Sequence, residues 1–434
     1  MFIQDQIDNA RRRIKNIEEN PRPEYMKTNK MRYEIELEEW IELDANWKAG
    51  KPFALLTGVG GGGRLERPLG FEACSLSGWG DRVRNPQKYR DLAVSKFGFP
   101  DHTCDRTLPP VGLYLNGEVP IPRLVSCLHS PCGPEGMWSP MSIAKYMGIP
   151  FFELLRLERS ENLGEKSLRF VAEQLEQLIE FAEATVPGIK YDESKLLESL
   201  EMDRQAAPYL RDLYELRKRV PCPVASQDAA RLGLRPGGDC NPKGMQFLKL
   251  YHEEALERAE KGIGGVKEEK LRIVWTSTFN YGRGTMDLLA KKGVSLVWFN
   301  NGMGPVSYCA GGLDPYANET TCGEIDFGRK LTPLEEIAAP HMYNTWGHGA
   351  DAWISPLIKI CRELKVDAVV DFMQVGCIVT KGFNKITADR ITKELGIPVL
   401  GLEGREHFMT EGEKSLMYQK LEEFLDLCIA NKKS

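Results

Sequence analysis

The fold is decided by a stretch that opens with TCDRTLPPVGLYLNG (Thr103 to Gly117) and continues into an apolar run, PRLVSCLHSPC, ending at Cys132. A segment that reaches Met147 follows, and GIPFFEL closes the stretch from Gly148 to Leu154. Short apolar runs bounded by glycine and proline are typical of buried strands, and the segment between them is typical of a helix. The stretch therefore predicts a strand, a loop that carries Cys132, a helix and a second strand.

The same order of segments returns near the C-terminus. VDAVVDFMQVGC (Val366 to Cys377) precedes KITADRITKEL, and GIPVLGL follows from Gly396. Cys132 lies 16 positions before Gly148, and Cys377 lies 19 positions before Gly396. We therefore expect two βαβ units, each with a cysteine just beyond the carboxyl end of a strand, where open α/β sheets bind ligands. The alternative is that α/β units look alike in general and that the cysteines are incidental.

Length and composition narrow the class of protein. A chain of 434 residues favours two or three domains, and 42% hydrophobic with 27% charged residues is ordinary for a globular protein. The net charge of −5 gives no electrostatic footprint for nucleic acid. No apolar run approaches the roughly 18 residues of a membrane span, and the N-terminus lacks the apolar region of a signal peptide. We expect a cytoplasmic protein that binds neither nucleic acid nor membrane.

Changes of pattern along the chain predict its organisation. Helical periodicity marks the N-terminus, strand-like runs begin at Phe53 and again at Leu271, and long amphipathic patterns such as Ser167 to Val186 fill the middle. Pro208 is expected to end or kink its helix. The predicted parts are a helical N-terminal segment (1–50), a first α/β lobe (51–157), a helical region (158–269) and a second α/β lobe (270–434).

The eleven cysteines are unlike a disulfide framework, because the cytoplasm keeps thiols reduced. No CxxC pair is present and histidines number only six, which argues against a local zinc knuckle or finger. A metal site would have to be assembled from distant loops. Cys127, inside a strand-like run, and Cys428, in the last helical pattern, are expected to be core residues.

Two further segments leave alternatives open. Gly60 to Gly63 follow the first strand-like run, and four glycines could bring backbone amides close to a phosphate, so that the chain would bind a nucleotide. They match neither GxGxxG nor the Walker pattern, and a loop that needs positive φ or close backbone approach explains them as well. The long irregular stretch from Tyr308 to Pro333 contains Cys309 and Cys322 and is typical of segments that line a site.

Three cysteines, Cys104, Cys132 and Cys377, lie in loops beside the predicted lobes. If they converge, three thiolates suit an iron–sulfur cluster, and a cluster of four irons then keeps one iron open. The alternative is three unrelated buried thiols. The acid/base candidates near these loops are His102, His129, Glu135 and His348, although a lone histidine or glutamate is more often structural.

Several motifs resemble the catalytic subunits of 2-hydroxyacyl-CoA dehydratases and benzoyl-CoA reductases. They are Cys104 before a glycine-bearing helix, PIPRLVSC, the Cys-x5-Trp pattern from Cys132 to Trp138, GIPFFEL, and the Cys377 loop with GIPVLGL. The resemblance runs from about residue 50 to 410. It implies two flavodoxin-like (Rossmann-like) parallel-sheet lobes with a helical insertion. It also implies a [4Fe-4S] cluster held by three cysteines, which fall here on Cys104, Cys132 and Cys377.

The resemblance further implies oxygen-sensitive chemistry on an acyl-CoA thioester. An ATP-dependent activase delivers one low-potential electron, the thioester carbonyl becomes a ketyl radical anion, and hydroxide departs from C2; in the reductase branch the electron enters an aromatic ring. A related second subunit usually completes the enzyme. Asp105, Arg106 and the glycine run depart from the family pattern, and they bear on the substrate and on the subunit's role. A cluster-carrying electron-transfer protein of the same fold, without dehydratase activity, is the further alternative.

Overall fold

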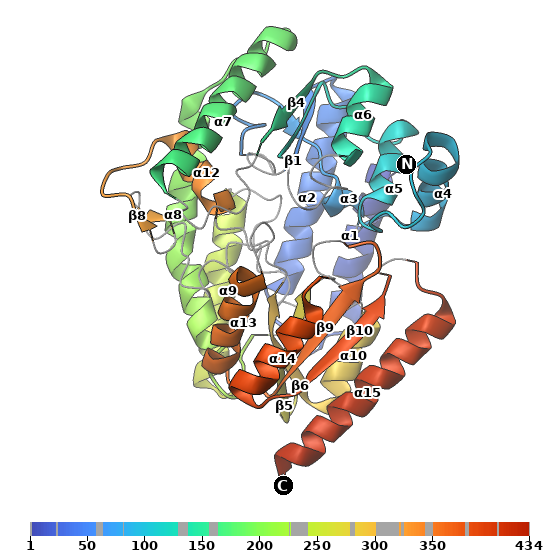
Figure 1. Cartoon of the computed structure of the whole chain (residues 1–434), viewed down its shortest axis with the longest axis vertical. Coiled ribbons are helices and arrows are strands. Elements are labelled where there is room, and N and C mark those ends of the chain that lie inside the picture. The colour runs from blue at the N-terminus through green and yellow to red at the C-terminus, as the bar shows by residue number, and fades with distance from the viewer. Residues whose placement is uncertain are drawn as a thin grey trace.

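A computed structural model of the chain contains two four-stranded parallel sheets among many helices (Figure 1). The mixed α/β class predicted from the sequence is confirmed. The residues that the structure describes are 2–22, 25–57, 64–80, 82–128, 138–155, 164–224, 226, 242–277, 283–300, 321–322, 325–342, 350–377, 382–405 and 408–433.

The two sheets share one strand order. The first has the order β2-β1-β3-β4 and the second β10-β9-β5-β6, so in each lobe the first strand lies between the second and the third. This is the order of flavodoxin-like folds, which confirms the two predicted lobes. The strands are β1 (Phe53–Thr57), β2 (Glu72–Ala73), β3 (Leu124–Leu128) and β4 (Phe151–Leu154) in the first sheet, and β5 (Leu271–Ser277), β6 (Val294–Asn300), β9 (Ala368–Gln374) and β10 (Val399–Gly404) in the second. A short antiparallel pair is formed by β7 (Thr321–Cys322) and β8 (Ile325–Asp326).

The Gly-Ile-Pro motif has the same structural role in both lobes. The helices α6 (Ser139–Met147) and α14 (Asn384–Leu395) end at Gly148 and Gly396, whose φ angles are +67° and +70°. A left-handed residue after a helix is normally glycine, because other side chains are strained there. The motif therefore ends a helix and starts the next strand in each unit.

The backbone hydrogen bonds around this motif also match. The Val125 N–H donates to the carbonyl oxygen of Pro150, and the Val369 N–H donates to that of Pro398, each at 3.0 Å. These bonds join the third strand of each lobe to the residue just before the fourth. The two units that the sequence predicted are therefore equivalent in hydrogen bonding as well as in order.

Helices cover both faces of each sheet. Along β1, Ala54 and Leu56 pack on one side, with α7 and α12, whereas Phe53 and Leu55 pack on the other, with α1 and α5. This alternation on two buried faces explains why the strand is apolar throughout. In the second lobe, one face packs against α8, α9 and α13 and the other against α10 and α15.

The helices not yet bounded are α1 (Phe2–Glu19), α2 (Asn29–Lys48), α3 (Ser77–Gly80), α4 (Pro86–Phe97), α5 (Leu108–Leu115), α7 (Glu165–Thr185), α8 (Glu193–Leu216), α9 (Pro242–Glu260), α10 (Arg283–Lys292), α12 (Pro333–Met342), α13 (Ala350–Glu363) and α15 (Glu411–Lys433). Within the described ranges, no helix is both long and apolar enough to cross a membrane. The predicted domain boundaries after residues 50, 157 and 269 are kept as a proposal.

One helix contributes to both hydrophobic cores. Near its start, Leu196 and Leu200 of α8 pack in the core of the first sheet, and near its end Leu210 and Leu213 pack in the core of the second. Its 24 residues span about 36 Å. Of the two predicted outcomes at Pro208, an end or a kink, the first is wrong: α8 continues through Pro208 to Leu216.

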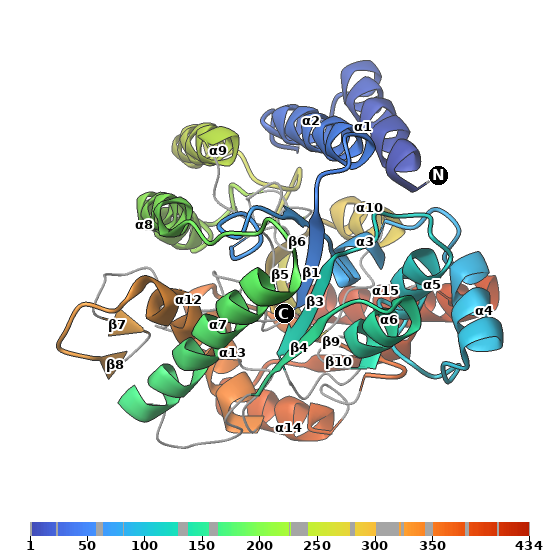
Figure 2. The ribbon, with the colours of Figure 1, turned by 90° about the horizontal axis from the view of Figure 1, so that it is seen from above.

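The two N-terminal helices, α1 and α2, lie on the same side of the molecule as α8 and α9. α1 packs on α2, α2 on α9, and α9 on α8, as Figure 2 shows from above. In α2, Trp40 belongs to the core of the first lobe and Ile35 to that of the second. The lobes are therefore tied by α2 as well as by α8.

A buried arginine joins the start of β5 to the end of α8. The Arg272 guanidinium donates to Glu269 at 2.6 Å and to the carbonyl oxygens of Arg217 at 2.6 Å and Leu364 at 2.8 Å. The side chains of Arg272 and Glu269 are 2% and 3% exposed. Because this charge is removed from water, its hydrogen bonds are needed to offset the cost of burial.

We predict that Arg272→Met lowers the free energy of unfolding by about 3–5 kcal/mol, because it leaves the Glu269 carboxylate buried without its cation. Equilibrium unfolding in urea measures the change. The control is Arg11→Met: Arg11 pairs with Asp8, and both side chains are 58% exposed, so the unfolding midpoint should stay where it is. Equal midpoints for the two variants would contradict the role given to Arg272.

Candidate functional site

Cys104 lies in the turn that leads into α5. Its carbonyl oxygen accepts hydrogen bonds from the N–H groups of Thr107 at 3.1 Å and Leu108 at 3.2 Å. The chain therefore enters the helix directly after this cysteine, whose side chain is half-buried.

Cys377 closes a tight turn at the carboxyl end of β9. Its N–H donates to the carbonyl oxygen of Gln374 at 3.1 Å, and Gly376 has φ = +91°. In the four-residue turn from Gln374 to Cys377, only the third residue has a positive φ. This is the pattern of a type II turn, which favours glycine at that position. The Cys377 side chain is only 7% exposed. The turn therefore holds this thiol at the end of the strand and away from water.

These two loops, from opposite lobes, meet. The Gln374 amide Nε2 lies 3.6 Å from the Sγ atom of Cys104, to which it donates a hydrogen bond. A Cβ atom added at Gly376 would lie 2.5 Å from the carbonyl oxygen of His102, so the backbones are in close contact. The turn keeps the Cα atoms of Gln374 and Cys377 within about 7 Å. The structure thus brings the Cys104 loop against the turn that ends in Cys377.

The Cys104 loop is also supported from within its own lobe. Gly80, the last residue of α3, packs so closely on the backbone of Arg106 that an added Cβ would overlap its carbonyl oxygen. The loop from residue 102 to 106 is therefore confined by a glycine on each side, Gly80 from the first lobe and Gly376 from the second. Confinement by backbone atoms limits how far Cys104 can move.

Asp105, one of the departures from the family pattern, forms an ion pair between the lobes. Its side chain is fully buried and accepts from Arg405, which follows β10, at 3.2 Å. Arg405 also donates to the carbonyl oxygen of Asp101 at 3.4 Å. A buried carboxylate needs such a partner, so Asp105 and Arg405 fix the register between the Cys104 loop and the second lobe.

The third predicted ligand, Cys132, lies outside the described residues, and its place stays a prediction. It follows β3, which holds in the first sheet the position that β9 holds in the second. Also outside the described residues are His129, Glu135, His348, Cys309 and Gly60–Gly63, and of Cys322 only the backbone, in β7, is described. Among the described residues no group of three or more His, Cys, Asp or Glu side chains is gathered as for a metal ion.

Other candidates are clearly placed. The His102 side chain is exposed, and the part of this residue that touches the second lobe is its backbone carbonyl. Cys127 is fully buried in β3, and Cys428 is 7% exposed in the core that α15 covers. The prediction that these two cysteines are core residues is confirmed. Burial raises the pKa of Cys127 to about 12, which keeps it a neutral thiol.

Sequence reasoning missed Gln374. Its side chain is fully buried, it donates to the Cys104 sulfur, and its Oε1 atom has no hydrogen-bond partner among the described residues. A signal was present: AVVDFMQ is an apolar strand whose last residue is an amide, two positions before a Gly-Cys pair. A buried polar side chain in that position requires a polar reason to be there.

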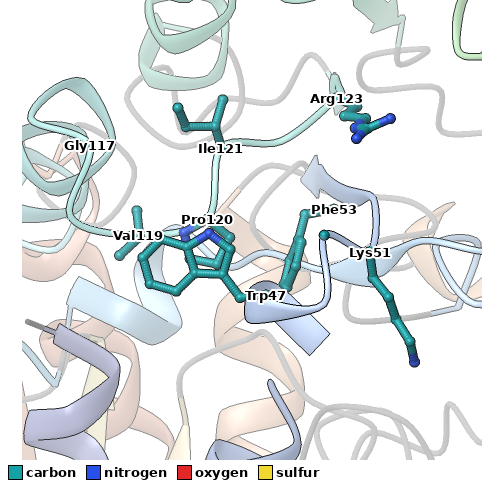
Figure 3. A pocket seen from close by; sticks show the side chains of 9 residues that line it. Trp47, Lys51, Phe53, Gly117, Val119, Pro120, Ile121 and Arg123 are labelled. Carbon is teal, nitrogen blue, oxygen red and sulfur yellow. The ribbon is translucent and has the colours of Figure 1, made fainter. Parts of the chain in front are cut away.

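A pocket lies at the opposite edge of the first sheet. It occupies about 270 Å³ where β1 and β3 begin, and Figure 3 shows Trp47, Phe53 and Pro120 close together in its wall. This volume is below the roughly 300–1,000 Å³ of typical ligand pockets. Because it opens at the amino ends of the strands, it does not contribute to the meeting point of the cysteine loops. The residues that line it are Trp47, Gly50, Lys51, Phe53, Gly117, Val119, Pro120, Ile121 and Arg123.

A comparison with known protein families identifies the family of this chain. The family model described as 2-hydroxyglutaryl-CoA dehydratase, D-component, matches residues 87–426, which is more than half of the chain. The chain belongs to this dehydratase family. The resemblance seen in the sequence motifs is thereby confirmed, and the match includes Cys104, Cys132 and Cys377. No curated protein matches the chain.

Membership of the dehydratase family makes the chain a dehydratase-type enzyme subunit. It also gives the meeting of the two loops a functional setting. Open α/β sheets in general bind ligands at the carboxyl ends of their strands, and the Cys104 loop of the other lobe reaches that end of β9.

We predict that Gly376→Ala lowers the free energy of unfolding by about 2–5 kcal/mol, because it adds a clash with the His102 carbonyl to the backbone strain. The matched control is Gly396→Ala, whose φ is also positive but whose added Cβ meets no atom within 4 Å. That variant should lose only the backbone part, about 1–2 kcal/mol. Equal losses in urea unfolding would mean that the contact between the lobes contributes nothing.

Proposed function

We propose that the chain is the iron–sulfur subunit of a radical 2-hydroxyacyl-CoA dehydratase, with a [4Fe-4S] cluster held by Cys104, Cys132 and Cys377. One observation carries the proposal: in a chain of the dehydratase family, the Cys104 sulfur lies against the turn that ends in Cys377. A cysteine loop of one lobe that packs on the cysteine-bearing turn of the other is what a shared ligand would require.

The residues present fit such a group. Thiolates are soft ligands that suit iron–sulfur clusters, and three of them leave one of four irons open for substrate or water. Cys377 is nearly excluded from solvent, and the buried Gln374 amide offers a hydrogen bond to the Cys104 sulfur. Donors of this kind accompany metal-bound ligands and hold their orientation.

When bound, the cluster would supply single low-potential electrons to the thioester carbonyl, so that a ketyl radical anion forms on the substrate and the C2 hydroxyl group can leave. The chain's own residues perform the supporting tasks. The Gly376 turn and the Asp105–Arg405 ion pair hold the two lobes in one register, so that sulfur atoms from both keep a fixed separation. Rigid placement of ligands lowers the cost of reorganisation during electron transfer.

The substrate class and the partners follow from the family and belong to the same proposal. The substrate is a CoA thioester of a 2-hydroxy acid, a related second subunit completes the enzyme, and an ATP-dependent activase delivers the electrons. The family description names a dehydratase, which supports the lyase over the dearomatising reductase.

Iron analysis after anaerobic purification tests the cluster. We predict a brown protein with about four irons per chain. Cys104→Ala, Cys132→Ala and Cys377→Ala should each lose most of this iron, because a ligand is removed. Cys361→Ala and Cys428→Ala are the controls, since both thiols are buried in the hydrophobic cores, and they should keep it. Equal iron in the two sets, or a colourless wild type, would overturn the ligand assignment.

Activity assays separate the reactions. The holoenzyme, supplied with activase, ATP and a strong reductant, should dehydrate 2-hydroxyacyl-CoA thioesters and leave benzoyl-CoA unchanged. Reduction of benzoyl-CoA would assign the subunit to the reductase branch. A cluster-loaded holoenzyme that turns over neither thioester would be an electron carrier of the same fold.

A further inference from the structure

We propose that Gln374 is a positioning residue that acts through the Cys104 sulfur to raise the reduction potential of the cluster. This inference rests on the proposed function, because it requires Cys104 to be a ligand. Among the described residues, the Cys104 sulfur is the polar partner that accounts for an amide at this position: the rest of β9 is mostly apolar, and the Gln374 side chain is fully buried.

The direction in which the amide points follows from charge. A metal-bound thiolate has no proton to give and can only accept, so the N–H2 end of Gln374 must face it. That end lies 3.6 Å from the Cys104 Sγ. The carbonyl end, Oε1, then finds no donor among the described residues. Among the contacts that the structure describes, the sulfur is therefore the group that orients this side chain.

The described residues offer no hydrogen bond that offsets the cost of burying the Oε1 end of this amide. An unpaired buried acceptor destabilises a protein by about 1–3 kcal/mol, whereas an apolar side chain of similar shape is often neutral or stabilising. A residue that lowers stability without a packing reason is typical of functional sites.

The effect on the cluster has a definite sign. Reduction adds one negative charge, part of which resides on the ligand sulfurs. An N–H group fixed against one of them stabilises the more negative, reduced state, and hydrogen bonds to sulfur are among the factors that set cluster potentials. Because the amide belongs to the second lobe and the sulfur to the first, the potential depends on the lobes being correctly docked.

The test compares two buried amides at the carboxyl end of the second sheet. Gln374→Leu removes the donor to sulfur and introduces no new ligand. Asn384→Leu, the matched control, removes an amide that is 9% exposed and whose Nδ2 donates to Asp371 at 2.7 Å, a carboxylate and not a sulfur. Each full-length chain is purified anaerobically, its iron is measured, and its cluster is titrated against potential by electron paramagnetic resonance.

We expect Gln374→Leu to keep its iron and its melting temperature, while the ratio of reduced to oxidised cluster at a fixed potential falls about tenfold, a shift of ~59 mV to more negative potential for a one-electron couple. Asn384→Leu should show the reverse, a lower melting temperature with an unchanged potential. A merely structural role for Gln374 would move stability and not potential.

Three results would overturn the inference, and they are distinguishable from a failure of the proposed function. An unchanged potential in Gln374→Leu means that the amide does not act on the sulfur. An equal shift in Asn384→Leu means that the effect is not specific to the sulfur contact. Loss of iron from Gln374→Leu means that ligation itself, and not its tuning, depends on the amide. A wild-type chain without iron, in contrast, would remove the proposed function.

Discussion

The arrangement of the site depends on one close backbone contact, between Gly376 of the second lobe and the carbonyl of His102 in the first. Any side chain at position 376 would separate these two backbones. Only because they touch does the Gln374 amide reach the Cys104 sulfur and does Arg405 reach the buried Asp105. Position 376 therefore requires glycine for two reasons: the type II turn needs a positive φ there, and the contact between the lobes leaves no room for a side chain.

Asp105 departs from the family pattern in the sequence, and the fold gives it a structural role. In the sequence it was only an unexpected residue after Cys104. In the fold it is a buried carboxylate whose partner lies 300 positions away, beyond the last strand. Buried ion pairs add little net stability, but they discriminate strongly against displaced arrangements, in which a charge would be left alone. The pair therefore contributes to the accuracy of docking more than to its strength.

The sequence was informative where the signal is local. Apolar runs predicted β1, β3, β5 and β9, and the Gly-Ile-Pro repeat predicted the equivalent helix ends and strand starts. It failed where distant packing decides. Pro208 lies within α8, because both cores hold that helix, and no local rule shows this. The contact between Gln374 and Cys104 joins residues 270 apart, so the pattern could name both cysteine loops but could not name the amide that lies between them.

The helix α8 has one more consequence. The first half of α8 is part of one hydrophobic core and the second half is part of the other. Neither lobe alone therefore buries the whole apolar face of this helix. Unfolding of either lobe would expose apolar surface of the other lobe to water. Both lobes should therefore unfold in a single cooperative transition, despite the length of the chain. For the same reason, a fragment that contains only one lobe would expose the apolar face of half of α8 to water, and it should tend to aggregate.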